Sequence, residues 1–511
     1  MGKFYVTTAI PYVNAAPHIG FTMEVLQGDI LARYYRFRGD SVFYLTGTDE
    51  HGTKLFNMAQ KEGITPQQLV DGHAAEFQKL TSALNITNDD FIRTSSDRHK
   101  KGAQKLWKIL AKNGDIYKGK YSGLYCSGCE AYVLEKDLIE GKCPIHKTEP
   151  EHLEEENYFF KLSKYSDQIK KLISSDELKV VPEARKNEIL NIIGETGLTD
   201  VSFSRPKKLL PWGIEVPEDP DHVMYVWCDA LSNYITALDF ENDGENFKKF
   251  WPCDAHIIGK DILRFHAGIW IGMLLSAGLQ VPKNIYVHGF VTADGQKMSK
   301  SIGNVVDPFE MISKYGVDAV RYYLAREIPT TDDGDFSKQR FEALYNNELA
   351  NNMGNLVNRV FAMTGKYFNS EVPQFSDEYN AASKVSNCAD AVAKTWVEYS
   401  KGIENFNLKT AIESVISLAD FGNRYIEENK PWSIAKTDQE LLKNVLYNLL
   451  EIIRQIGYLL TPFLPETSEK ILVALGQDKN LTSESAKIWR SLKSGSKIVT
   501  PGVLFQRIEQ V

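Results

Sequence analysis

The sequence predicts an α/β chain in which a doubly wound parallel sheet is interrupted by an insert and followed by an all-α helix bundle. Three observations lead to this prediction. Strand-like and helix-like segments alternate over residues 1–115 and 222–282; the alternation is absent over residues 116–221; and apolar residues have helical spacing over residues 341–511. At 511 residues the chain also exceeds the roughly 250 to 300 residues at which a single core stops growing.

The first half of the sheet domain sets the pattern. Residues 3–8 predict a strand, and an amphipathic helix is expected from His18 to Arg38, before Gly39. Further strands and helices are expected in alternation at residues 41–46, 65–84, 90–94 and 97–112.

Residues 116–221 predict an inserted domain, because they combine hairpin-like segments, a cysteine cluster and a helical stretch rich in Glu and Lys. The alternation returns at Met224, with a strand expected at 255–258, a helix at 260–277 and a strand at 284–291. Helices of the bundle are expected at residues 341–367, 390–406, 408–429, 438–460 and 465–475.

Composition excludes several classes of protein. No apolar run reaches the roughly 18 residues that a membrane helix needs, and no leader-like segment begins the chain, so we expect a cytoplasmic protein without a membrane partner. The net charge is −8, so a nucleic-acid partner would have to contact local basic patches. Six cysteines in this length are too few for a disulfide framework.

Four side chains of the insert have the spacing of a metal site, in which Cys126-Ser-Gly-Cys129 is followed by Cys143-Pro-Ile-His146. Two pairs of ligands, each spaced by three, can surround one tetrahedral Zn²⁺, and four protein ligands leave no position for a substrate. The pattern therefore predicts one structural zinc ion. The alternative, four unrelated thiol and imidazole side chains, is much less frequent at this spacing.

A nucleotide site is expected where the first strand meets the first helix. The first N–H groups of a helix lack partners within the helix, and its dipole favours phosphate. His18 lies at this end and can donate to a phosphate, while Gly20 lets a ligand approach the backbone without meeting a Cβ. The alternative, that His18 only caps the helix, is the commoner outcome for an isolated His-x-Gly.

A second stretch, Lys297-Met298-Ser299-Lys300-Ser301, follows a strand and an Asp-Gly turn. Two lysines spaced by three in a loop flanked by Ser and Gly suit a clamp on a polyphosphate. We therefore expect Lys297, Ser299 and Lys300 to contact ATP.

His18-Ile-Gly and Lys297 to Ser301, one at each end of a nucleotide-binding fold, resemble the paired signatures of the class I aminoacyl-tRNA synthetases, and nearly the whole chain resembles the methionyl-tRNA synthetases, in the bacterial short form with one zinc knuckle. The resemblance implies a Rossmann-type catalytic domain. It also implies a ligase that activates L-methionine with Mg²⁺-ATP to methionyl adenylate, releasing pyrophosphate, and transfers it to the 3′-terminal adenosine of tRNA(Met), the initiator included, releasing AMP.

The resemblance also implies how the C-terminal half is used. Residues 283–340, which include the lysine loop, are expected to contact the tRNA stem, and residues 341–511 to bind the anticodon. The resemblance stops where some members of the family continue into a further C-terminal domain, so a monomer is expected.

A methionine pocket should offer aromatic walls and a weak donor near sulfur. Asp49, in the loop after the second strand, is the expected partner of the substrate ammonium; the alternative is a solvated loop aspartate. Arg205 matches an arginine at the rim of the family's active site. The resemblance implies a pocket lined by the following residues, each of which alone is more often ordinary core: Ala9, Ile10, Tyr12, Trp227, Ala230, Tyr234, Ile262 and His266.

On the adenosine side, Gly259 and Asp261 follow a strand and open a helix, so Gly259 can admit the adenosine and Asp261 can accept from ribose hydroxyls. His256 is a candidate for the same site. Catalysis is assigned to donors for the charge that develops on the phosphates, namely His18, Lys297 and Lys300.

The sequence departs from the family at one position of the first signature. The signature commonly ends in a second histidine, where this chain has Phe21. An aromatic ring cannot donate to phosphate, although it can pack against the adenine, so catalysis at this signature is assigned to His18 alone.

Asn355, Arg359 and Trp432 match residues that read the CAU anticodon in the family. An unstacked base can stack on Trp432 while Asn355 and Arg359, four apart on one helix face, donate to base edges. The alternative is that all three belong to the bundle, with Trp432 capping its core.

Three other interpretations compete with this one. Synthetases for leucine, isoleucine or valine need an editing domain, because one methylene discriminates by only about 1 to 3 kcal/mol, and an insert of roughly a hundred residues is too small for one. A cysteine-specific enzyme would place zinc in the pocket, whereas this cluster is closed. A non-catalytic tRNA-binding relative is disfavoured by the intact His18 and Lys297 to Ser301, and methionine-dependent ATP–pyrophosphate exchange would distinguish it.

Overall fold

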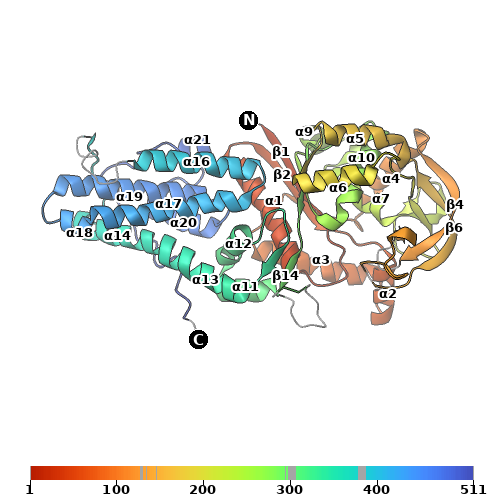
Figure 1. The fold of residues 1–511 in the computed structure, drawn as a ribbon, viewed down its shortest axis with the longest axis horizontal. Helices are drawn as coiled ribbons and strands as arrows, with labels where there is room; N and C mark the ends of the chain where they lie inside the picture. Colours follow the sequence, from red (N-terminus) through yellow and green to blue (C-terminus); the bar gives the residue numbers. More distant parts are fainter. Residues whose placement is uncertain are drawn as a thin grey trace.

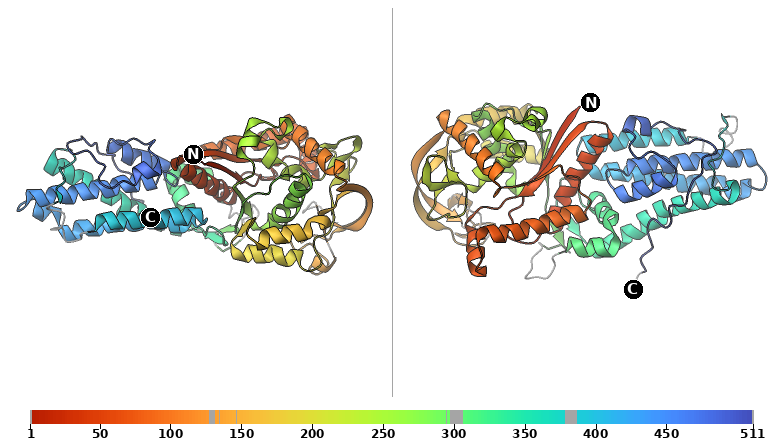
Figure 2. Two further views of the ribbon diagram at one scale, coloured as in Figure 1. Left: turned by 90° about the horizontal axis from the view of Figure 1, so that it is seen from above. Right: turned by 180° about the vertical axis from the view of Figure 1, so that it is seen from behind.

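The computed structural model describes residues 2–126, 131–133, 135–145, 147–293, 295–296, 306–377 and 387–509. Figure 1 shows an elongated molecule with a helix-covered sheet at one end and a bundle of long helices at the other; α1 (Ile19–Phe37) lies between them. In both views of Figure 2 the N-terminus lies at the junction of the two ends. No helix among the described residues is both long and apolar enough to cross a bilayer.

A six-stranded parallel sheet confirms the predicted fold class. Its strand order is β3-β2-β1-β12-β13-β7, and every neighbouring pair is parallel. The order changes direction between β1 and β12, and in such sheets ligands bind outside the carboxyl ends of the strands at this switch point. The strands are Lys3–Thr8 (β1), Ser41–Thr48 (β2), Asp90–Arg93 (β3), Lys179–Val181 (β7), Ala255–Gly259 (β12) and Asn284–His288 (β13).

The sheet takes strands from outside the ranges expected for it. β7 lies within residues 116–221 and pairs with β13, where the side chain of Val180 is buried. β13 itself lies beyond residue 282. A strand of three residues is too short to show a period-2 pattern, so the sequence does not reveal that β7 extends the sheet.

The helices beside the sheet begin where local signals predict. α1 starts after His18, and α3 (Pro66–Ala83) has a complete capping box between Thr65 and Gln68. α4 covers Asp97–Lys112. The sequence does not predict α2 (Thr53–Glu62), because its N-cap is a glycine and no side chain caps it.

Residues 116–221 contain the expected hairpins. A four-stranded antiparallel sheet, β5-β4-β6-β8, consists of Ala131–Val133, Ile116–Cys126, Glu151–Phe160 and Val201–Ser202. A three-stranded sheet follows, with β9 (Ser204–Pro206), β10 (Glu215–Val216) and β11 (Asp219–Met224). The helices of this region are α5 (Ser166–Ser174) and α6 (Glu183–Ile193).

After β11 the chain returns to the sheet domain. α7 (Val226–Leu231) and α8 (Asn233–Thr236) follow directly, and β12 leads through a π-helical segment at Phe265–Trp270 into α10 (Ile271–Ser276). β14 (Val291–Ala293) pairs with β15 (Gly334–Phe336), and between them lie α11 (Pro308–Tyr315) and α12 (Val317–Arg326).

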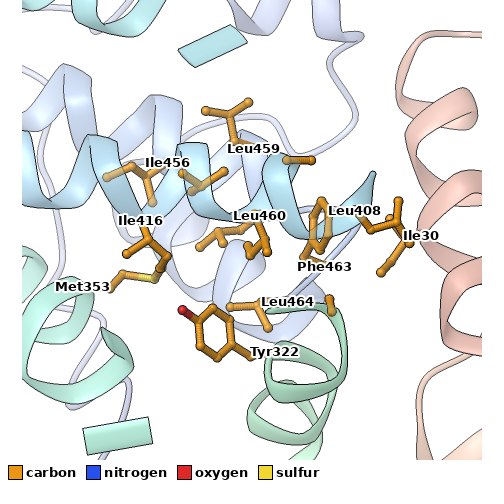
Figure 3. Packing of buried hydrophobic residues seen from close by; sticks show 14 of the residues in the cluster. Ile30, Tyr322, Met353, Leu408, Ile416, Ile456, Leu459, Leu460, Phe463 and Leu464 are labelled. Carbon is orange, nitrogen blue, oxygen red and sulfur yellow. The ribbon is translucent and has the colours of Figure 1, made fainter. Parts of the chain in front are cut away.

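The C-terminal helices confirm the predicted bundle. They share one apolar core with α1: Figure 3 shows Ile30 of α1 beside Leu408 and Phe463. The helices are Lys338–Leu344 (α13), the π-helical Tyr345–Gly354, Asn355–Phe368 (α14), Cys388–Glu404 (α16), Leu408–Asn429 (α17), Pro431–Ile434 (α18), Gln439–Leu459 (α19), Pro465–Ala474 (α20) and Ser483–Ala486 (α21).

Candidate functional site

His18 is the N-cap of α1. Its Nδ1 accepts a hydrogen bond of 3.1 Å from the backbone N–H of Gly20, and an added Cβ at Gly20 would lie 2.9 Å from the imidazole Cε1. Glycine is therefore required for the ring to lie over the helix end. A backbone N–H can only donate, so Nδ1 is unprotonated and the neutral ring carries its proton on Nε2. Desolvation lowers the pKa of His18, which favours this neutral form.

The loops that follow β1 and β2 are joined by main-chain hydrogen bonds. The N–H of Asp49 donates to the carbonyl of Pro11 at 2.9 Å, and the N–H of Val13 donates to the carbonyl of Asp49 at 3.2 Å. Tyr12 and Asp49 thus form a parallel bridge, and Asp49 is buried, with Thr94 donating to its carboxylate at 3.4 Å. The structure brings Tyr12 and Asp49 together, and the alternative of a solvated loop aspartate does not hold.

Two pairs of rings lie on the helices that follow β11 and β12. Trp227 stacks on Phe265 with ring centroids 3.8 Å apart, and the Tyr234 hydroxyl lies 2.7 Å from Nε2 of His266. Nδ1 of His266 lies 3.0 Å from the carbonyl of Ile262, so Nδ1 carries the proton and Nε2 accepts from Tyr234. Burial lowers the pKa of His266 to about 4. The structure therefore brings Tyr234, Ile262 and His266 together.

Three further residues of the expected pocket lie directly after β1 or on α7. Ala9 and Ile10 directly follow β1, at the carboxyl end of the strand next to the switch point. Ala230 lies on α7, where its carbonyl accepts a 2.6 Å hydrogen bond from the side chain of Asn233. These positions agree with a pocket outside the sheet's carboxyl edge.

His256 does not lie at the open edge of the sheet, contrary to the expectation that it helps to bind ATP. It is the second residue of β12 and fully buried. Its Nδ1 lies 2.7 Å from the Thr7 hydroxyl, and the indole N–H of Trp270 donates to its Nε2 at 3.2 Å. Both ring nitrogens are satisfied by core partners, so His256 is a structural residue.

Gly259 and Asp261 lie at the carboxyl end of β12, as expected for the adenosine side. A Cβ added to Gly259 would lie 2.8 Å from Oδ1 of Asp261 and 3.7 Å from Cε1 of His288, so the glycine keeps this corner open. Because position 259 has no side chain, a ligand can approach the backbone closely here.

The sequence does not reveal a further pair at this corner, Glu24 and His288. Nε2 of His288 lies 2.8 Å from a Glu24 carboxylate oxygen, and Nδ1 lies 2.8 Å from the carbonyl of Gly289. Burial opposes charge on the imidazole, but the hydrogen bond to Glu24 outweighs it and raises the pKa of His288; burial raises the pKa of Glu24. One signal was available, a glutamate within the apolar stripe of an amphipathic helix.

Phe21 packs edge to face on Phe77 of α3, with ring centroids 4.9 Å apart, and is buried in the core. Its ring is thus buried between α1 and α3. Arg205 lies on β9, buried, where its guanidinium donates to Ser202 and to the carbonyl of Ser204 and lies 4.5 Å from the ring centre of Tyr225.

Half of the predicted zinc ligands lie in the described part of the chain. Cys126 and Cys143 are buried; Sγ of Cys126 lies 4.0 Å from the Thr148 hydroxyl, and the N–H of Cys143 donates to the Thr148 carbonyl at 2.9 Å. The two cysteines therefore meet at Thr148. Cys129 and His146 lie outside the described residues, and among the residues searched there is no group of three metal-binding side chains.

Lys297, Ser299, Lys300 and Ser301 also lie outside the described residues. The described chain before them ends in a turn closed by two hydrogen bonds between Ala293 and Gln296. β14 (Val291–Ala293) leads into this turn, and the strand before it, β13, ends at His288, which contacts Glu24 of α1. The Glu24–His288 pair therefore joins α1 to the end of β13.

In the bundle, the guanidinium of Arg359 lies 5.9 Å from the ring centre of Trp432 and pairs with Glu427 at 2.7 Å. Trp432 is 40% exposed on α18, so it does not cap the core. Asn355 is exposed on the same helix as Arg359, one turn earlier. The three side chains offer an open surface at this end of the bundle, formed by α14 and α18.

Two family descriptions match the chain: "tRNA synthetases class I (M)" over residues 4–150 and 129–361, and "Anticodon binding domain of methionyl tRNA ligase" over residues 375–511. The methionine–tRNA ligase of Caldanaerobacter subterraneus is 42% identical over 510 residues, covering 99% of this chain and 79% of that protein. That of Brucella suis is 41% identical over 509 residues, covering 99% and 98%. The solved Mycobacterium tuberculosis methionyl-tRNA synthetase in complex with methionyl-adenylate has a TM-score of 0.93 at 38% identity, covering 99% of this chain and 100% of that one.

Proposed function

The chain belongs to the methionyl-tRNA synthetase family, and we propose how its residues divide the work of that enzyme. It activates methionine with ATP to methionyl adenylate and charges tRNA with it. The observation that supports the division best is the bridge between Tyr12 and Asp49, since it sets a carboxylate and an aromatic ring side by side at the switch point of the sheet.

Methionine binds between the Asp49 loop and the segments that follow β11 and β12. The Asp49 carboxylate pairs with the substrate ammonium, because it is buried directly after the carboxyl end of β2, where water screens an ion pair with a bound cation only weakly. Trp227, Tyr234 and His266 surround the thioether. The Tyr234 hydroxyl donates to the neutral imidazole of His266, and this hydrogen bond fixes the orientation of the hydroxyl. Ala9, Ile10, Tyr12, Ala230 and Ile262 complete the pocket, and Arg205 lies at its rim.

ATP binds over the N-terminus of α1. Nε2–H of His18 donates to the phosphates, as do Lys297 and Lys300, while Ser299 shapes the loop. Gly20 and Gly259 admit the nucleotide, and Asp261 accepts from the ribose. Phosphoryl chemistry needs mainly positioning and charge stabilisation, so no covalent role is assigned to the protein.

We also propose one structural Zn²⁺ held by Cys126, Cys129, Cys143 and His146. The burial of Cys126 and Cys143 and their shared contact with Thr148 support it, because thiolates at the end of β4 and in the next turn suit a tetrahedral site. The ion would fix the ends of a long hairpin. Mg²⁺ would accompany ATP, supplying charge to its phosphates.

Asn355, Arg359 and Trp432 would read the anticodon of tRNA(Met). The exposure of Trp432 and the guanidinium beside its ring support a platform on which a base can stack. We further propose that the enzyme acts as a monomer, since all the assigned residues come from one chain.

Two substitutions test the division. Replacing His18 by Ala should lower the rate of methionine-dependent ATP–pyrophosphate exchange by about 10²-fold, as loss of one transition-state donor does, and leave the KM for methionine nearly unchanged. Asp49→Asn should instead raise the KM for methionine by about 10-fold or more, because it removes the charge opposite the ammonium. The proposal is wrong if the two substitutions produce the same pattern.

A further inference from the structure

A buried carboxylate joins the two walls of the methionine pocket. The Oδ2 of Asp229 lies 2.7 Å from Nδ1 of His51, and its Oδ1 lies 2.8 Å from Nε2 of His99. All three side chains are at most 3% exposed. Two imidazoles therefore share one carboxylate in an environment from which water is excluded.

The three residues come from separate elements. His51 lies two residues after Asp49 in the loop that follows β2, and His99 lies on α4, where its Nδ1 contacts the Thr236 hydroxyl at 2.8 Å. Asp229 lies on α7, the helix that also holds Trp227 and Ala230. The carboxylate of Asp229 thus links the loop that holds Asp49 to α7, the helix that holds Trp227.

The ionisation of Asp229 supports a contact with His51 and His99 that is present without substrate. Burial opposes ionisation of Asp229, but its electrostatic attraction to His51 and the hydrogen bonds from both histidines outweigh it and lower the pKa of Asp229. The carboxylate is therefore ionised over the whole range in which the enzyme would be assayed. The link does not depend on a substrate, so it can hold the pocket in shape before methionine arrives.

We propose that Asp229 is a positioning residue for methionine, which sets the separation between Asp49 and the Trp227 wall by holding His51 and α7 together. The proposal rests on the function assigned above to Asp49 and Trp227. A pocket that must contact an ammonium and a thioether at once is sensitive to this separation, and a misplacement of about 1 Å can cost about 10²-fold in rate.

The test compares Asp229→Asn with His51→Asn and His51→Ala in methionine-dependent ATP–pyrophosphate exchange. Asp229→Asn keeps the shape of the side chain and removes its charge, and should raise the KM for methionine by about 10-fold with little change in the KM for ATP. Asn at position 51 still offers an N–H to Asp229, so His51→Asn should stay closer to the wild type than His51→Ala.

Asp318→Asn is the matched control. Asp318 is also buried and accepts a hydrogen bond, from the N–H of Thr467 at 2.6 Å. However, Asp318 lies on α12, and Thr467 lies near the start of α20. Its substitution should lower the thermal midpoint and leave the KM for methionine unchanged. If Asp229→Asn behaves in the same way, the residue is structural only and the inference is overturned.

The design also distinguishes this inference from the function on which it rests. If Asp49→Asn leaves the KM for methionine unchanged, the assignment of Asp49 fails first. If Asp49→Asn raises that KM and neither Asp229→Asn nor His51→Ala does, only the positioning role fails. Because loss of a buried charge can unfold a chain, the KM of His51→Ala decides between the two outcomes if Asp229→Asn is not recovered folded.

Discussion

Two histidines of the site have opposite tautomers, each fixed by a backbone group. The N–H of Gly20 can only donate, so it leaves Nδ1 of His18 bare; the carbonyl of Ile262 can only accept, so it requires a proton on Nδ1 of His266. His18 therefore offers Nε2–H to a ligand, whereas Nε2 of His266 accepts a hydrogen bond from the Tyr234 hydroxyl. One residue type thus supplies a donor on the proposed ATP side and an acceptor within the proposed methionine pocket.

The neutral state of His266 makes the stability of the fold depend on pH. Its pKa is about 4 when folded, against 6.5 for an unperturbed histidine, so the unfolded chain binds the proton first. Stability from this group is complete above pH 6.5, decreases as the pH falls from about 6.5, and is lost by about pH 4, for a total of about 3 kcal/mol. Thermal midpoints of the wild type should therefore decrease more steeply between pH 6.5 and 4.5 than those of His266→Gln. Parallel pH profiles for the two proteins would contradict this.

Residue identity alone does not tell which polar side chains face a ligand. His256 lies in β12 and His266 in the helical segment that follows it, yet the first is bonded within the core and the second is in the expected pocket. Phe21 occupies a signature position but packs on Phe77. The Glu24–His288 pair joins positions 264 residues apart. Side-chain direction and long-range pairing depend on the packed fold, so a single sequence does not supply them.

At the scale of elements, local signals are sufficient for most of the architecture. The sequence predicts β1, a helix from His18, a helix from Thr65 and the long helices of the bundle from local signals, and the structure confirms these elements. Two elements lack such signals. α2 has no side-chain cap, and β7 is three residues long, so neither can be predicted from the chain alone.

The hairpin of β4 and β6 should depend on the proposed zinc ion. Cys126 ends β4, and Cys143 lies in the connection to β6, so removal of the metal would release both ends of this segment. We expect one zinc per chain, lost in Cys143→Ser but retained in Cys388→Ser, which changes a buried cysteine of the bundle. In hydrogen exchange, a chelator should increase exchange over residues 116–160 and leave α19 protected. Equal zinc content in the two variants would refute the site.

At the scale of the whole molecule, a buried arginine connects the sheet domain with the helix bundle. Arg321 of α12 pairs with Asp29 of α1 at 2.7 Å, and it donates to the carbonyls of Leu84, Pro462 and Phe463. Both charged side chains are fully buried. The contact therefore connects the helix that begins at His18 with the turn between α19 and α20 in the bundle.

Replacing Arg321 by Met should loosen this junction. It leaves three carbonyls without their donor and removes one partner of a buried carboxylate, for which a loss of about 3 to 5 kcal/mol in stability is typical. Arg454→Met is the matched control, since Arg454 is equally buried, pairs with Glu451 and donates to the carbonyls of Ala486 and Ile488, but lies wholly within the bundle.

Both variants should melt at lower temperature than the wild type, but their activities should differ when measured well below the melting temperature. Pyrophosphate exchange needs no contact with the anticodon-binding helices, whereas charging of tRNA requires the bound anticodon and the active site to be held at a fixed separation. We therefore expect Arg321→Met to lower the rate of tRNA charging several-fold more than the rate of exchange, and Arg454→Met to leave the ratio of the two rates near that of the wild type. A ratio that moves equally in both variants would mean that Arg321 contributes stability alone, and that the orientation of the bundle is set by the apolar core it shares with α1.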